Sequence, residues 1–176
     1  MSRTLVLGYG NFDRQDDGVA WHILTILASR LGYPLPITPE EGFQLTENPI
    51  ELYFQIQITP ELAELVAQYD FVCFIDSHTG NIPEEIHIER VEPVYQHSPL
   101  THHMTPATLL SIAKSLYSCK TQAFSVSVRG YQYNFCQSLS EETYRLAIIA
   151  AQIIWNWLMT GQVPMNNRFG DNLPMH

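Results

Sequence analysis

Acidic residues gather directly after the first apolar segment of the sequence. The stretch GYGNFDRQDDGVAWHI, residues 8–23, places Asp13, Asp16 and Asp17 between that segment and a run with helical spacing. A further acid, Asp76, ends the apolar run FVCFID. Carboxylates can serve as general bases or as oxygen ligands of metal ions. These positions are therefore the first candidates for a chemical role.

A phosphate site is the rival interpretation of the same stretch. Nucleotide-binding loops of this type carry three glycines, in the pattern G-x-G-x-x-G. Here Gly8 and Gly10 are present, but position 13 is Asp. The acids would also put negative charge where a helix N-terminus attracts phosphate. The sequence predicts no nucleotide.

Each acid also has a purely structural interpretation. Asp16 can cap the following helix, and Asp17 can complement the helix dipole. Asp76 can cap the turn at 77–80. In doubly wound sheets, however, ligands bind beyond the carboxyl ends of the strands. If the first and third strands are neighbours, Asp17 and Asp76 face one crevice.

Histidines could complete this set of side chains. His102 and His103 lie in the segment LTHHMTP, directly before a predicted helix, whereas His22 and His87 lie within predicted regular elements and are expected to be structural. Two carboxylates and one imidazole suit Zn, Ni or Mn and leave coordination positions open. That pattern is typical of a catalytic site.

The pattern of apolar residues predicts the elements that position these side chains. Apolar runs predict buried strands, helical spacing with capping residues predicts helices, and the alternating run EEIHIERV predicts an edge strand with one wet face. The predicted strands are 4–7, 51–57, 71–76, 84–91 and 123–128, and the predicted helices are 19–32, 60–69, 106–117 and one that opens at 138–142.

This order predicts an α/β fold: a single doubly wound domain over residues 1–160, with about five mostly parallel strands and helices on both faces. Residues 161–176 are expected to form a mobile tail.

Composition excludes several classes of partner. Nine Lys and Arg against 18 Asp and Glu give a formal charge of −9, which disfavours nucleic acid and anionic membranes. Three cysteines without a C-x-x-C pair suit reduced thiols. No segment has the length and apolarity of a signal peptide or membrane span. We therefore expect a cytoplasmic protein.

Taken together, these segments resemble the nickel-iron hydrogenase maturation endopeptidases, which remove a C-terminal extension from the hydrogenase large subunit after nickel insertion. The matching segments are LVLGYGNFDRQDDGVAWHI, FVCFID, THHMTPATLLSIAKSLY, AFSVSVRGY and SLSEE, in the family's order. The resemblance implies that Asp17, Asp76 and His102 contact nickel and carry the catalysis, with His103 as the alternative to His102. The nickel is then supplied by the substrate, a hydrogenase large-subunit precursor.

One segment departs from the family pattern. Relatives often carry a glycine pair after the second strand, where this chain has Gln57, Ile58, Thr59 and Pro60. A catalytically inactive module that docks on a hydrogenase-like precursor is therefore the alternative function. The oligomeric state is left open.

Overall fold

The fold is built on a single five-stranded sheet. The computed structural model describes residues 1–95 and 104–164. The strand order is β2-β1-β3-β5-β4, and all neighbours are parallel except β4 and β5. The strands are β1 (Thr4–Tyr9), β2 (Ile50–Gln55), β3 (Phe71–His78), β4 (Ile86–Val91) and β5 (Gln122–Arg129). The predicted α/β class, the five strands and the edge strand at 84–91 are confirmed, and the structure adds that this edge strand runs antiparallel to its neighbour.

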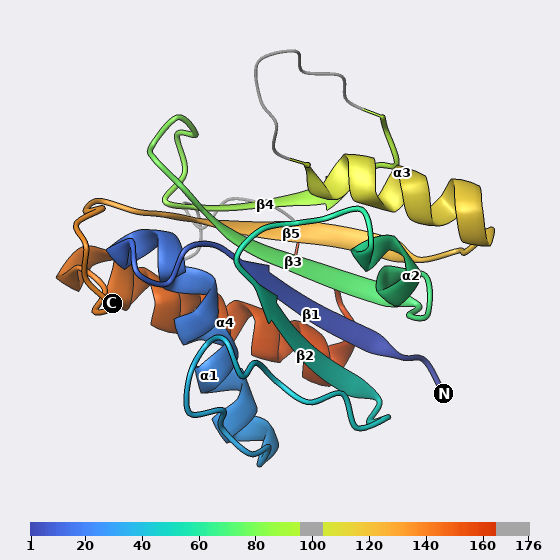
Figure 1. The fold of residues 1–176 in the computed structure, drawn as a ribbon, viewed down its shortest axis with the longest axis horizontal. Helices are drawn as coiled ribbons and strands as arrows, with labels where there is room; N and C mark the ends of the chain where they lie inside the picture. Colours follow the sequence, from blue (N-terminus) through green and yellow to red (C-terminus); the bar gives the residue numbers. More distant parts are fainter. Residues whose placement is uncertain (96–103, 165–176) are drawn as a thin grey trace, which may run out of the picture.

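Helices cover both faces of this sheet (Figure 1). The helices α1 (Val19–Leu31) and α4 (Glu141–Thr160) pack on one face, and α2 (Leu62–Val66) and α3 (Pro106–Tyr117) pack on the other. A short 3-10 helix, η1 (Gln15–Gly18), joins β1 to α1. Since each face has its own apolar core, the central strands are buried on both sides.

Strand β1 illustrates why the central strands read as continuous apolar runs. Leu5 and Leu7 enter the core beneath α2 and α3, while Val6 enters the core beneath α1 and α4. All three side chains are fully buried. Alternate side chains point to opposite faces of a sheet, so covering both faces requires an apolar residue at every position.

Side chains cap two of the helices, and a third helix is shorter than predicted. Thr105 caps α3 by accepting a hydrogen bond from the backbone N–H of Thr108 at 3.2 Å, and Ser140 caps α4 in the same way. Helix α2, predicted for 60–69, is only five residues long. Its last turn tightens through i→i−3 hydrogen bonds that bring Tyr69 into the core, and the chain turns directly into β3.

The second described part of the chain, residues 104–164, ends shortly after α4. Helix α4 stops at Thr160, and Gly161 adopts a left-handed φ of 70° that terminates it. Residues 165–176 lie outside the described residues, so the mobile tail stays a prediction. None of the helices that the structure describes has both the length and the apolar character of a membrane span.

Candidate active site at the carboxyl ends of β1 and β3

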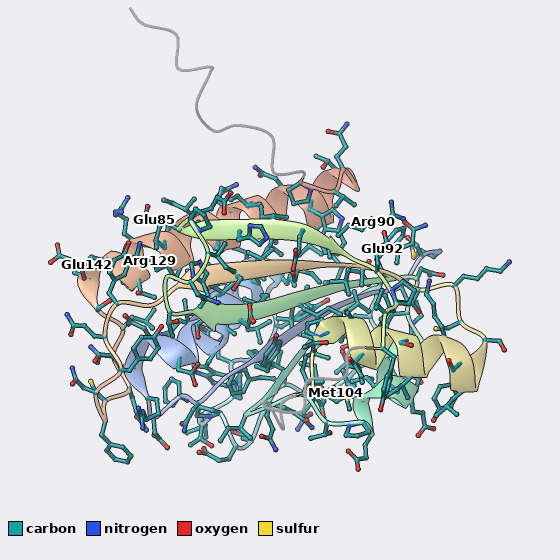
Figure 2. The ribbon with its side chains drawn as sticks, turned by 90° about the horizontal axis from the view of Figure 1, so that it is seen from above. Glu85, Arg90, Glu92, Met104, Arg129 and Glu142 are labelled. Carbon is teal, nitrogen blue, oxygen red and sulfur yellow. The ribbon has the colours of Figure 1, made fainter. Side chains whose placement is uncertain are left out.

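A cavity of about 650 Å³ opens beyond the carboxyl end of β1. Tyr9, Asn11 and Asp17 line one side, and the segment 56–60 after β2 lines another. Met104, which lies two residues before α3 and is labelled in Figure 2, also belongs to the lining. Strand β1 pairs with β3, so the two acid-bearing strands are neighbours as the prediction required, but only Asp17 lines this cavity.

Asp17 is held in this cavity by the turn that follows β1. The backbone N–H of Asn11 donates to Asp17 Oδ2 at 2.9 Å, and the Ser77 hydroxyl donates to Oδ1 at 2.8 Å. Gly10 allows this turn because its φ is +146° and any Cβ there would collide with the carbonyl oxygen of Asp17. Each carboxylate oxygen retains a second lone pair for a ligand.

Asp76 lies one contact further in, behind Tyr9. The Tyr9 hydroxyl donates to Asp76 Oδ2 at 2.9 Å, and Ser127 lies opposite Asp76 in the β3–β5 register. Burial raises the pKa of Asp76 to about 6, the hydroxyls of Ser127 and Tyr9 oppose that rise, and the negative charge of Asp17 adds to it. The carboxyl group titrates close to neutrality, which suits a general base.

The two carboxylates are positioned crosswise. Ser77 on β3 holds Asp17, while Tyr9 on β1 holds Asp76 on β3. Burial raises the pKa of Tyr9 most strongly, and the same two acids raise it further, so its hydroxyl stays protonated as a donor.

Sequence reasoning missed the roles of both hydroxyl residues, Tyr9 and Ser77. The signal available for Tyr9 was a polar-tipped residue between two glycines at the end of a buried strand.

Asp16 does not cap α1, contrary to the structural interpretation suggested by the sequence. It is fully buried and accepts hydrogen bonds from the Ser140 backbone N–H at 2.8 Å and hydroxyl at 2.7 Å. Further donors are the Thr143 hydroxyl and the backbone N–H groups of Tyr131 and Gln132. Burial pushes the pKa of Asp16 upward, but these hydrogen bonds outweigh it and the net pKa is lowered. Asp16 therefore ties η1 to the start of α4.

The structure also bears on the structural roles suggested for Asp17, at a helix dipole, and for Asp76, at a turn. Asp17 lies in the first turn of η1, so its charge can complement a helix dipole, but both of its oxygens are engaged by the turn and by Ser77. Strand β3 continues to His78, two residues beyond the predicted end, so Asp76 does not cap a turn at 77–80.

His102 and His103 both lie outside the described residues, so the choice between them stays a prediction. Met104, which follows them directly in the sequence, lines the same cavity as Asp17. Within residues 1–95 and 104–164, no three His, Cys, Asp or Glu side chains come together in a way that could hold a metal ion.

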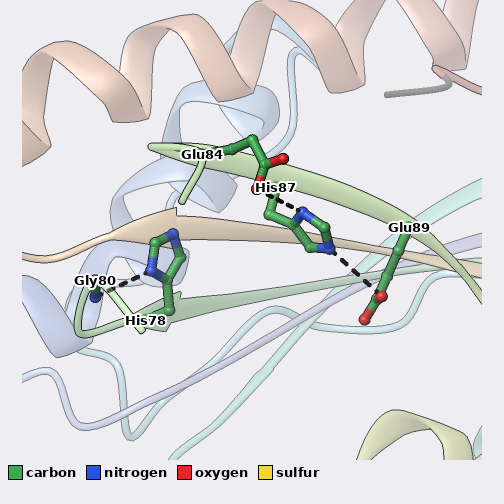
Figure 3. Close-up of polar contacts among 5 residues, drawn as sticks. All are labelled: His78, Gly80, Glu84, His87 and Glu89. Carbon is green, nitrogen blue, oxygen red and sulfur yellow. Dashed lines mark hydrogen bonds and ion pairs between the residues drawn. The ribbon is translucent and has the colours of Figure 1, made fainter. Parts of the chain in front are cut away.

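Two other histidines, His78 on β3 and His87 on β4, lie on neighbouring parts of the sheet (Figure 3). Nδ1 of His78 accepts from the Gly80 backbone N–H at 3.1 Å, and burial lowers the pKa of this imidazole. His87 lies between Glu84 and Glu89, with a nitrogen 3.4 Å from each carboxylate. These contacts fit the structural role predicted for His87.

The departure from the family pattern borders the cavity. Gln57, Ile58, Thr59 and Pro60 all line it, in a loop between β2 and α2. Side chains therefore project at a position where a glycine pair would leave open space.

Comparison with known proteins shows which solved structures share this fold. No protein-family model and no curated protein matches the sequence. Among solved structures, the chain has the fold of the nickel-iron hydrogenase maturation proteases, as the sequence resemblance predicted.

Three of these structures show how far the likeness extends. The hydrogenase maturating endopeptidase HybD from E. coli has a TM-score of 0.66 at 19% identity, over 90% of this chain and 94% of that one. The maturation protease HycI from Thermococcus kodakarensis has a TM-score of 0.64 at 17% identity, with coverage of 90% and 94%. The hydrogenase 2 maturation peptidase from Thaumarchaeota archaeon SCGC_AB-539-E09 has a TM-score of 0.60 at 22% identity, with coverage of 89% and 98%.

Proposed function

We propose that this protein is an endopeptidase that removes the C-terminal extension of a nickel-iron hydrogenase large-subunit precursor after nickel insertion. The observation that carries the proposal is the convergence of Asp17 and Asp76 at the carboxyl ends of β1 and β3, in the fold that such proteases share. The free cysteines in the described residues are consistent with action in the cytoplasm.

In this proposal the nickel arrives as part of the substrate. Asp17, Asp76 and a histidine from the segment before α3, His102 or the alternative His103, complete its coordination. Oxygen and imidazole donors both suit nickel. Without the metal these polar groups have no partner on the substrate, so cleavage waits until nickel is inserted.

The chemistry follows from the two carboxylates. Bound nickel supplies Lewis-acid activation of the scissile carbonyl or of a water molecule. Asp76, with its pKa raised to about 6, is the better candidate for the general base. Asp17, fixed by two hydrogen bonds, is the better candidate for a stationary ligand.

The test compares nickel-loaded and nickel-free precursor of a hydrogenase large subunit from the same genome. Intact mass spectrometry measures loss of the C-terminal extension by the wild type and by Asp17→Asn, Asp76→Asn, His102→Ala and His103→Ala. We expect loss only from nickel-loaded precursor, abolished in both aspartate variants and in one histidine variant. Glu64→Gln, an exposed carboxylate on α2, is the control that retains activity. Equal processing of both precursors would refute gating by nickel.

The second candidate function is an inactive module that docks on such a precursor. The loop at Gln57, which replaces a glycine pair beside the cavity, is the feature that favours it. A stable complex with nickel-loaded precursor, without any loss of mass, is the result that this alternative predicts.

A further inference from the structure

A second cavity adjoins the one that contains Asp17. Its volume is about 590 Å³, and it lies between the turn after β1, the carboxyl end of β2 and the segment 39–43. The two cavities share five lining residues, which form a common floor: Gly10, Asn11, Ile56, Gln57 and Thr59. The two cavities therefore lie side by side, and together they are called the cleft, each being one half of it. Each half is large enough for a few side chains of a bound peptide.

Aromatic rings line the second half of the cleft. Phe12, Phe43 and Phe54 all contribute to the lining and all pack against Trp21, with ring centroids 6.0, 5.2 and 5.2 Å from it. Phe12 and Phe43 are only partly buried, so both present ring surface to the cavity. Because Trp21 lies in the core on α1, the three rings are packed against the core and form one apolar surface.

Carboxylates border the same half. Asp13, Glu40 and Glu41 line it, and none of the three forms an ion pair with another residue in the described part of the chain. Asp13 accepts one hydrogen bond from Gln137, and Glu41 accepts one from the backbone N–H of Ile37. The negative charge of this wall is therefore uncompensated. Such a wall attracts cationic groups.

We propose that this half of the cleft is a substrate subsite for an extended polypeptide segment that carries a large apolar or aromatic side chain next to a lysine or arginine. The inference rests on the proposed function in one respect. A polypeptide whose reacting bond lies beside Asp17 must continue along the cleft, and the shared floor leads into the aromatic half. The aromatic rings receive the apolar side chain, and the bordering carboxylates receive the cation.

The proposal also gives the segment between α1 and β2 a role. Pro39, Glu40, Glu41 and Phe43 all come from this segment, which the chain inserts between α1 and the edge strand β2. The insertion builds the outer wall of the subsite. It therefore selects the substrate sequence without touching the acids that carry the chemistry.

The test measures binding of three fluorescein-labelled hexapeptides to the full chain by fluorescence anisotropy. The first is Gly-Ser-Phe-Lys-Ser-Gly, the second has Glu in place of Lys, and the third has Ser in place of Phe. We expect the first to bind about tenfold more tightly than either of the others, and its affinity to fall as salt is raised. Equal affinity for all three, or no binding at millimolar concentration, would overturn the proposal.

Variants locate the binding in the cleft. Phe43→Ala should weaken the first peptide about tenfold, and Glu40→Gln about threefold. Tyr117→Ala, an exposed aromatic on α3, and Glu64→Gln are the matched controls and should leave binding unchanged. Circular dichroism verifies that each variant is folded. If Phe43→Ala does not fold, the ranking of the three peptides on the unmodified chain decides the matter.

Peptide binding and the proposed protease activity can fail independently. The peptides carry no nickel and are not cleaved, so Asp76→Asn should bind the first peptide as the wild type does. Selective peptide binding without any processing of a precursor would leave the subsite standing and reject the protease. Processing without peptide selectivity would do the reverse.

Discussion

Asp76→Asn should stabilise the folded protein at neutral pH. Burial raises the pKa of the Asp76 carboxyl from 3.8 to about 6, so the folded state holds its proton more tightly than the unfolded chain does. The stability due to this group is therefore greatest below pH 3.8 and falls as the pH rises to about 6. A rise of this size corresponds to at most about 3 kcal/mol at pH 7. Asparagine carries no charge and avoids this cost.

The assay is urea denaturation of the metal-free protein and of Asp76→Asn between pH 4 and pH 8. The difference in the free energy of unfolding should be small at pH 4 and grow to about 2–3 kcal/mol at pH 7, in favour of the variant. Glu64→Gln removes one negative charge from an exposed site on α2 and corrects for the general effect of net charge. Its difference from the wild type should stay nearly constant with pH.

A pH-independent difference, or a variant less stable than the wild type at pH 7, would refute this account of Asp76. Either result would mean that the carboxylate is well compensated in the folded state. The predicted result would instead mean that the chain keeps a destabilising group behind the cavity. Proteins tolerate such a cost mainly where a group has a function.

Three further substitutions test the surroundings of the site. Tyr9→Phe removes a hydrogen-bond donor that favours the charged form of Asp76. The pH range over which the Asp76 carboxyl loses its proton should therefore move upward, and NMR titration of the carboxyl carbon measures this. An unchanged range would contradict the role of the hydroxyl. Asp16→Ala leaves buried donors on the loop before α4 without an acceptor, and should lower the free energy of unfolding in urea by about 3–5 kcal/mol. A loss under about 1 kcal/mol would contradict the role of Asp16 as their acceptor. Gly10→Ala brings a Cβ against the Asp17 carbonyl at a positive φ and should cost about 1–3 kcal/mol by the same measurement; a neutral effect would show that the turn relaxes freely.

The sequence by itself determined the arrangement of elements and the end of the sheet where the acids gather. Apolar runs 4–7 and 71–76 can be buried on both sides only in a parallel sheet covered by helices on both faces. In such a sheet the residues that follow each strand meet at one edge. The approach of Asp17 to Asp76 is the prediction that these two local patterns make; in the structure β1 pairs with β3, Asp17 lines the cavity and Asp76 lies behind Tyr9.

Only the tertiary structure separated Asp16 from Asp17. The two neighbours point to different places because both lie in η1, and successive side chains of a 3-10 helix point about 120° apart. Asp16 then meets Ser140, which is 124 residues away along the chain, whereas Asp17 faces the cavity. The helix-capping preference of an isolated aspartate was outweighed by several buried donors that only the folded chain brings together.

The same reason explains the hydroxyl partners and the cleft. Ser77 reaches Asp17 across 60 positions of sequence, and Tyr9 reaches Asp76 across 67. The aromatic half of the cleft joins the segment 39–43 to residues that flank β1 and β2. Hydrophobic periodicity reports which face of an element is buried, but it does not report which side chains from distant elements meet. Those contacts depend on the register of the strands and on the path of the loops, which packing of the whole chain decides.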